Sequence, residues 1–64
     1  MIYLTRLNGS KYCLMADLIE EVEAKPNTVI KLRDGNIHIV SESVEEVRQG
    51  VIEFYRAIHA HTLE

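Results

Sequence analysis

The sequence predicts an α+β fold, in which a small antiparallel sheet of about five strands, including two hairpins, packs against one C-terminal helix. Asn8-Gly9 and Asp34-Gly35 each separate two short β-favouring segments, and Asx-Gly between such segments is a strong local signal of a hairpin. After Ser43, hydrophobic side chains recur at steps of three and four residues, the spacing of one helix face. We expect residues 1–62 to form a single domain.

The first predicted hairpin pairs residues 1–7 with residues 11–15. A two-residue loop at Asn8-Gly9 fixes the register, which places Leu7 opposite Ser10, Thr5 opposite Tyr12, Leu4 opposite Cys13, Tyr3 opposite Leu14 and Ile2 opposite Met15. Both faces of this ribbon are then largely apolar, and one helix can cover only one of them. The same register sets Arg6 against Lys11, a pair of like charges that needs solvent, an acidic side chain or an anion beside it.

The segment after this hairpin begins with a brief turn at Ala16-Asp17 and continues as a strand over residues 18–24. The alternation of apolar and acidic side chains is imperfect there, so a helical turn over residues 17–21 is the alternative. Pro26 ends the strand, because its ring fixes φ and its nitrogen has no hydrogen to donate.

The second predicted hairpin pairs residues 28–33 with residues 36–40 across a two-residue loop at Asp34-Gly35. This register places Leu32 opposite Ile37 and Ile30 opposite Ile39 on one apolar face. The opposite face then carries Lys31 with His38 and Arg33 with Asn36.

Ser43 and Glu46 form a predicted capping box, so the helix should begin at about Val44. Its buried stripe is predicted to consist of Val44, Val47, Val51, Phe54 and Ile58, with Tyr55 at the edge. Gly50 and Ala57 make a small-residue flank that permits close backbone approach, either by a strand or by another subunit's helix. Alternatively, Gly50 is simply tolerated within the helix. The candidate interface residues are Arg6, Gly50, Ile52 and Ala57.

A chain of 64 residues is near the lower limit for folding on a hydrophobic core alone. The single Cys13 excludes an intramolecular disulfide, and no cluster has metal-ligand spacing, so we expect a homo-oligomer. The net charge is −3, and residues 41–64 hold five acids against two bases, which is unfavourable for nucleic-acid binding. No signal peptide or membrane-spanning run is visible, so we expect a cytoplasmic protein without membrane insertion. Leu63-Glu64 is interpreted as a cloning remnant.

No combination of residues indicates catalysis, so we expect neither an enzyme nor a cofactor or metal site. Cys13 is predicted to be a buried small side chain without a nearby histidine. His59 and His61 are two residues apart, on different sides of a helix, so they should not share a metal ion. The acidic run of Asp17, Glu20, Glu21 and Glu23 is read first as a solvated face, with a weakly held cation or a basic partner as the alternative.

Four stretches in the order seen here resemble a known family. They are Thr5-Arg6-Leu7-Asn8-Gly9, Asp17-Leu18-Ile19-Glu20, Pro26-Asn27-Thr28-Val29-Ile30 followed by Gly35, and Val40 followed by Ser43-Val44-Glu45-Glu46-Val47. As a set, they resemble the small flagellar FlbD proteins, also called SwrD, which are distinct from the larger transcription activator of the same name. The matching positions with a structural reason are Asn8, Gly9, Asp17, Pro26, Asp34, Gly35, Ser43 and Glu46.

The resemblance implies a cytoplasmic bacterial protein, placed at the flagellar motor, that supports motor power and swarming through contacts with motor or stator proteins. It implies no catalytic residues. A second likeness is to the carbon storage regulators, dimeric RNA-binding proteins of similar length. Arg6 matches their basic first strand, but Ser43-Val44 stands where an arginine is required. RNA binding is therefore the alternative function.

Overall fold

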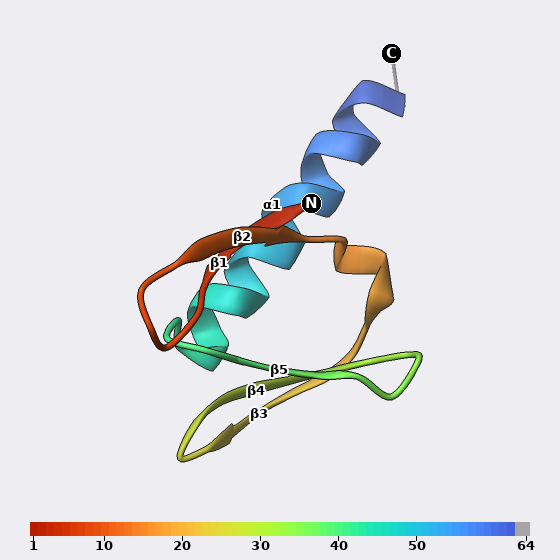
Figure 1. Cartoon of the computed structure of the whole chain (residues 1–64). Helices are drawn as coiled ribbons and strands as arrows, with labels where there is room; N and C mark the ends of the chain where they lie inside the picture. The colour runs from red at the N-terminus through yellow and green to blue at the C-terminus, as the bar shows by residue number, and fades with distance from the viewer. Residues whose placement is uncertain (63–64) are drawn as a thin grey trace.

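The structure is a computed structural model that describes the backbone of residues 1–62 and the side chains of residues 1–58. Its elements are β1 (Ile2–Thr5), β2 (Lys11–Leu14), the 3-10 turn η1 (Ala16–Leu18), β3 (Ile19–Lys25), β4 (Asn27–Leu32), β5 (Ile37–Val40) and α1 (Val44–Thr62). The predicted α+β class, the five strands and the C-terminal helix are confirmed. The strands form two antiparallel sheets, β1-β2 and β3-β4-β5, rather than one (Figure 1).

The first hairpin loop contains three residues instead of the predicted two. Arg6 N–H donates to the Ser10 carbonyl at 2.8 Å, and Gly9 N–H donates to the Arg6 carbonyl at 2.9 Å. Gly9 has φ +94°, the left-handed conformation that follows a type I turn in three-residue hairpin loops. The Asn8 side chain accepts from Ser10 N–H at 2.9 Å, which stabilises this turn over the two-residue alternative.

The second loop repeats the same geometry. Leu32 N–H donates to the Asn36 carbonyl at 2.9 Å, Gly35 N–H donates to the Leu32 carbonyl at 3.0 Å, and Gly35 has φ +92°. Asp34 Oδ1 accepts from Asn36 N–H at 3.0 Å, as Asn8 does from Ser10. Each loop thus gains one residue over the prediction, and each hairpin register shifts by one residue.

The register predicted for the first hairpin is therefore wrong. Ile2 lies opposite Leu14 and Leu4 opposite Tyr12, so these four side chains share the inner face. Lys11 lies opposite Thr5 instead of Arg6, so the predicted pair of like charges is not formed. In the observed register, the buried side chains of both strands lie on one face of the hairpin and the exposed side chains lie on the other. The predicted register instead paired inward-facing residues of one strand with outward-facing residues of the other.

The second hairpin is corrected in the same way. Ile30 lies opposite His38, Lys31 opposite Ile37 and Val29 opposite Ile39. His38 therefore shares the inner side with Ile30, whereas Ile37, predicted to be inside, is 62% exposed. The predicted pairs Lys31 with His38 and Arg33 with Asn36 are wrong for the same reason.

Between the hairpins, the chain forms η1 over Ala16–Leu18 and enters β3 at Ile19. The helical turn considered for residues 17–21 is thus a short 3-10 turn that begins one residue earlier. β3 and β4 pair up to Lys25 opposite Asn27, so the chain reverses at Pro26 as predicted. β4 is the central strand of its sheet, with β3 and β5 on its two edges.

The core lies where α1 crosses the two sheets. Its buried hydrophobic residues are Ile2, Leu4, Leu14, Ala16, Ile30, Leu32, Val40 and Val47. Val47, 1% exposed, is the deepest helix residue, and Val44, Val51 and Phe54 are half-buried around it. Ile58 is 41% exposed, against the prediction, because the C-terminal part of α1 projects past both sheets (Figure 1).

Two sets of contacts position the helix. The predicted capping box is present, since Ser43 Oγ accepts from Glu46 N–H at 3.1 Å and Glu46 Oε1 accepts from Ser43 N–H at 3.2 Å. Just before it, Glu42 accepts from Thr5 N–H at 2.9 Å and from Thr5 Oγ1–H at 2.8 Å. This Thr5–Glu42 contact, with Ser41 N–H donating to the Thr5 carbonyl, joins the first hairpin to the end of β5.

Candidate functional site

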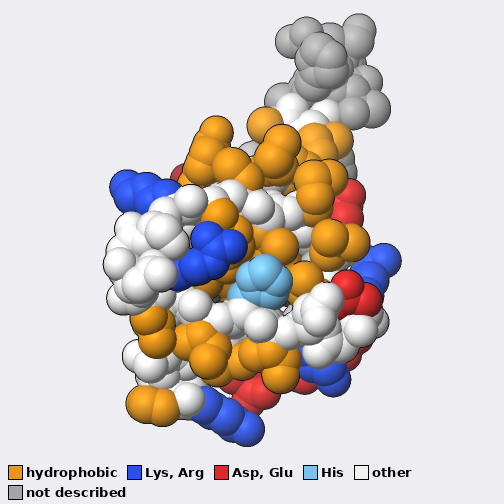
Figure 2. Space-filling view, in the orientation of Figure 1, with side chains coloured by type: hydrophobic (Ala, Val, Ile, Leu, Met, Phe, Trp, Pro, Cys, Tyr) orange, Lys and Arg blue, Asp and Glu red, His pale blue; other side chains and the backbone are white. Residues whose placement is uncertain are grey.

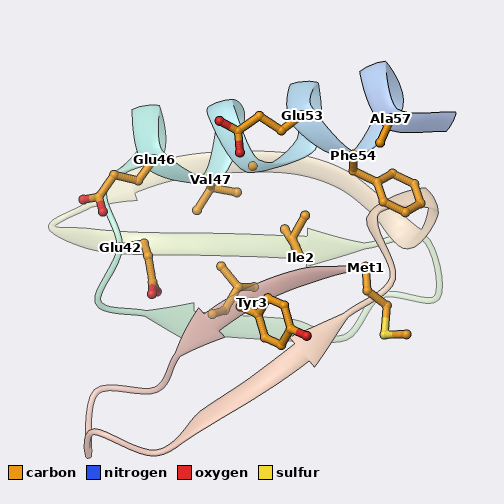
Figure 3. Close-up of a pocket in the computed structure, with 11 residues that line it drawn as sticks. Met1, Ile2, Tyr3, Glu42, Glu46, Val47, Glu53, Phe54 and Ala57 are labelled. Atoms are coloured by element: carbon orange, nitrogen blue, oxygen red, sulfur yellow. The ribbon is translucent and has the colours of Figure 1, made fainter. Parts of the chain in front are cut away.

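A groove of about 470 Å³ lies between β1 and α1 (Figure 3). Its β1 side consists of residues 1–4, and its other side consists of residues from the end of β5 and the helix. The helix and β5-side lining is Glu42, Glu46, Val47, Gly50, Glu53, Phe54 and Ala57. We call this the β1–α1 groove, and it brings residues 1–4 together with residues 42–57.

The groove is acidic. Its lining includes Glu42, Glu46 and Glu53, and no lysine, arginine or histidine side chain. Burial raises the pKa of Glu42, but hydrogen bonds from Thr5 and the nearby Lys11 charge outweigh that effect and leave the pKa below its ordinary value of 4.5. Glu42 is therefore ionised at neutral pH.

Gly50 shapes the middle of the groove. A Cβ at Gly50 would lie 3.6 Å from Ile2 Cγ2, an ordinary contact distance, so the glycine leaves room beside β1 without being required by a clash. Ala57, the other member of the predicted small-residue flank, is exposed and also lines the groove. The structure thus brings these two candidate interface residues together.

The remaining candidate interface residues, Arg6 and Ile52, do not line this groove. Ile52 is half-buried on α1. Arg6 lies with its Cζ 4.0 Å from the centroid of the Tyr12 ring, a cation–π contact.

Tyr12 connects Arg6 to His38. The Tyr12 and His38 rings are stacked with centroids 5.6 Å apart, and Tyr12 Oη lies 3.0 Å from His38 Nδ1. Burial raises the pKa of Tyr12 above 10.0; the Arg6 charge opposes this change and the Glu42 charge adds to it. Figure 2 shows hydrophobic side chains around a basic side chain and a histidine on this face of the molecule.

A second surface is the outer hairpin face, which comprises Met1, Tyr3, Cys13 and Met15. Tyr3 is 80% exposed and Met1 is 61% exposed, and Cys13 lies opposite Tyr3 and is also exposed. The expectation that Cys13 is buried is wrong, because the corrected register turns it away from the core. The face therefore presents large apolar side chains on a paired two-stranded ribbon.

The family-motif residues have structural positions in the fold. Asn8, Gly9, Asp34 and Gly35 make the two loops, Pro26 makes the reversal between β3 and β4, and Ser43 and Glu46 cap α1. Asp17, in η1, accepts a hydrogen bond from Tyr55 Oη at 2.8 Å, and that hydrogen bond raises the pKa of Tyr55. Each family-motif residue therefore has a role in forming the fold.

The four acidic side chains of residues 17–23 contact three other side chains, Tyr55, Lys31 and Lys25. Glu20 and Glu21 lie 3.5 Å and 4.0 Å from Lys31 Nζ, and Glu23 lies 3.3 Å from Lys25 Nζ. Among the residues whose side chains are described, no three His, Cys, Asp or Glu come together as metal ligands. The predictions for His59, His61 and Leu63-Glu64 lie outside the described side chains.

Sequence reasoning missed the groove residues Met1, Tyr3, Glu42 and Glu53. A signal was present in Glu46 and Glu53, which are seven residues apart and so lie on one side of the helix. Their position beside β1 depends on tertiary packing.

No helix within residues 1–62 is long and apolar enough to cross a membrane.

Comparison with known proteins gives one result. Neither a curated protein nor a solved structure matches the sequence. A family model described as FlbD, flagellar and swarming motility proteins, matches residues 1–59. Because this match spans both hairpins, the helix cap and most of α1, the chain belongs to the FlbD family of flagellar and swarming motility proteins.

Proposed function

We propose that this chain is a flagellar accessory protein that supports motor power and swarming motility by binding motor or stator proteins. In this proposal it acts in the cytoplasm, at the flagellar motor, and carries out no catalytic step. The family match supplies the motility context.

The proposal that the chain binds other proteins rests on the exposed apolar side chains of the outer hairpin face. Tyr3, at 80% exposure, belongs to a strand whose opposite side holds the buried Ile2 and Leu4. The fold therefore fixes the apolar face as a preformed surface, the arrangement expected for protein recognition. We further propose that this face mediates association between copies of the chain, because a domain of this size gains stability from added burial.

RNA binding is the second candidate, and only the Arg6–Tyr12–His38 cluster favours it. Aromatic rings and arginine can stack on bases. Here the Arg6 guanidinium already packs on its own chain's Tyr12 ring at 4.0 Å. The net charge of −3 also opposes phosphate binding, so we favour protein partners.

A complementation experiment tests the proposed function. In a motile bacterium that carries this gene, the gene is deleted and replaced by wild type, by Met15→Lys on the outer hairpin face, or by Ile37→Lys on β5. Both side chains are exposed apolar residues, so each change adds one charge at low cost to folding. We expect Met15→Lys to reduce swarming and motor torque, and Ile37→Lys to restore both.

Photocrosslinking identifies what the face contacts. A photoreactive side chain at Cys13 should give a crosslink to a motor or stator protein, whereas one at Glu21, on β3, should not. Normal torque and swarming in the deletion strain would refute the proposed function. A salt-sensitive gel shift with mixed RNA, together with normal torque, would favour the RNA-binding candidate.

A further inference from the structure

We propose that the β1–α1 groove binds an extended segment of another protein, rich in lysine or arginine, which adds to the free edge of β1 as a new strand. This inference rests on the proposed function, because it names the chemistry of one protein contact. The groove shares Met1 and Tyr3 with the outer hairpin face, but it does not include Cys13 or Met15, the two positions used to test the proposed function.

One edge of β1 is free along the groove. In its sheet, β1 has β2 as its single strand neighbour among the described residues. On the other edge, the Thr5 carbonyl accepts from Ser41 N–H and Thr5 N–H donates to Glu42. Backbone direction alternates along a strand, so Tyr3 presents its N–H and C=O at that same edge. On the N-terminal side of Thr5, the edge of β1 therefore offers the Tyr3 N–H and C=O groups for hydrogen bonding beside the groove.

The groove has the length of a short extended segment. Residues 1–4 span about 10 Å at the rise of a strand, and α1 from Glu46 to Ala57 spans about 17 Å at the rise of a helix. An extended segment of about four or five residues has a comparable length. Figure 3 shows α1 running along one side of the groove, with β1 on the other. Extended peptides add to exposed strand edges, where main-chain hydrogen bonds give affinity and neighbouring pockets select the side chains.

The charge of the groove favours a basic segment. Glu42, Glu46 and Glu53 line the groove, and no basic side chain does. The Glu42 carboxylate is held by Thr5, which keeps its charge fixed at the closed end of the β1 edge. Val47, Gly50 and Phe54 provide apolar surface between these acids. A segment that alternates basic and apolar side chains matches both features, because successive side chains of a strand point to opposite sides.

A second copy of the chain fits this groove poorly. Each copy would bring its own Glu42, Glu46 and Glu53 toward those of its partner, and like charges facing each other oppose pairing. A basic segment instead neutralises these charges.

A peptide titration tests the proposal. The probe is a capped five-residue peptide that alternates lysine or arginine with valine, added to isotope-labelled full-length protein while amide signals are followed by NMR. We expect the Tyr3 and Gly50 amides to shift and the affinity to fall as salt is raised. Two peptides serve as controls: one with glutamate in place of the basic residues, and one N-methylated throughout, which cannot donate backbone hydrogen bonds. Neither should bind.

Two protein variants localise the effect. Glu53→Lys reverses a charge in the groove, and Glu45→Lys makes the same change on an exposed part of α1 outside it. We expect Glu53→Lys to weaken peptide binding by about fivefold or more and Glu45→Lys to leave it nearly unchanged. Equal weakening by the two variants, or shifts confined to β5, would overturn the proposal.

Two further outcomes would also overturn it. The first is failure of the basic peptide to bind at about millimolar concentration. The second is movement of the Gly50 and Phe54 amide signals, which lie in the groove and outside the outer hairpin face, on concentrating the protein alone; that would assign the groove to a second copy. Neither result bears on swarming of the deletion strain, so failure of the groove and failure of the proposed function are distinguished.

Discussion

Removal of the Glu42 carboxylate should destabilise the fold in a pH-dependent way. Glu42 accepts two hydrogen bonds from Thr5, at 2.9 Å and 2.8 Å, and these join the first hairpin to the connection between β5 and α1. Hydrogen bonds to a charged group each contribute about 1.5–3 kcal/mol in favourable settings, and partial exposure reduces that value. We therefore expect Glu42→Ala to lower the free energy of unfolding at neutral pH by about 1–2 kcal/mol.

That loss is large for a protein of this size, whose total stability is expected to be about 3–10 kcal/mol. The sign of the pH effect follows from the lowered pKa of Glu42. Its charge stabilises the folded state fully above the ordinary pKa of 4.5, and this contribution is lost as pH falls through the lower folded-state pKa. The difference between wild type and Glu42→Ala should therefore narrow in acid.

Urea unfolding followed by circular dichroism measures both effects, at neutral pH and at about pH 3. Glu42→Gln is an informative companion, because its amide oxygen can still accept from Thr5 N–H while the charge is gone. Glu53→Ala, which removes an exposed carboxylate elsewhere, is the control and should change stability little. Equal unfolding free energies for wild type and Glu42→Ala at neutral pH would show that the Thr5–Glu42 contact does not stabilise the fold.

Three further predictions concern the core, the loops and the outer hairpin face. Val47→Asp should abolish the folded circular dichroism signal, because it places an unpaired charge at a site 1% exposed, whereas Arg48→Asp next to it should remain folded. Gly35→Ala should cost about 1–2 kcal/mol because φ there is +92°, whereas Gly50→Ala should be neutral or stabilising; equal effects on urea unfolding would contradict this reasoning. The melting temperature should rise with protein concentration, and Met15→Lys should reduce that dependence; a wild-type melting temperature independent of concentration would refute self-association.

The elements could be predicted from sequence because their signals are local. The helix begins at Val44, directly after the Ser43 cap, and Pro26 marks the reversal between β3 and β4. Each of these signals acts within three or four residues of its own position. The class of the fold follows from such signals alone.

The hairpin registers could not be predicted by the same rule, because Asx-Gly fits two kinds of turn. The type I′ two-residue loop that Asx-Gly favours requires positive φ at both residues, whereas in the observed loops among the described residues positive φ occurs at Gly9 and Gly35 alone. Asn8 and Asp34 instead use their side chains to accept from the residue two positions on. The same competing turn explains the misplacement of Cys13 and of Ile37.

The candidate groove depended on information that the sequence does not carry locally. Tyr3 and Glu53 are fifty residues apart and meet because α1 crosses beside β1. Periodicity predicted that α1 has a buried side, but it did not determine which strand would lie along it. Exposure of Ile58 was missed for a related reason, since the stripe continues after the sheets end.

The paired loops constrain how this small protein can change over evolutionary time. Deleting one codon from residues 7–9 would produce the shorter turn and rotate every later side chain of that ribbon by half a turn relative to its neighbour. Leu14 would then point toward solvent and Cys13 toward Val47 and its neighbours. Selection should therefore eliminate insertions or deletions of one residue in either hairpin loop. Insertions or deletions of two residues keep each side chain on its original face, so they should be tolerated more often.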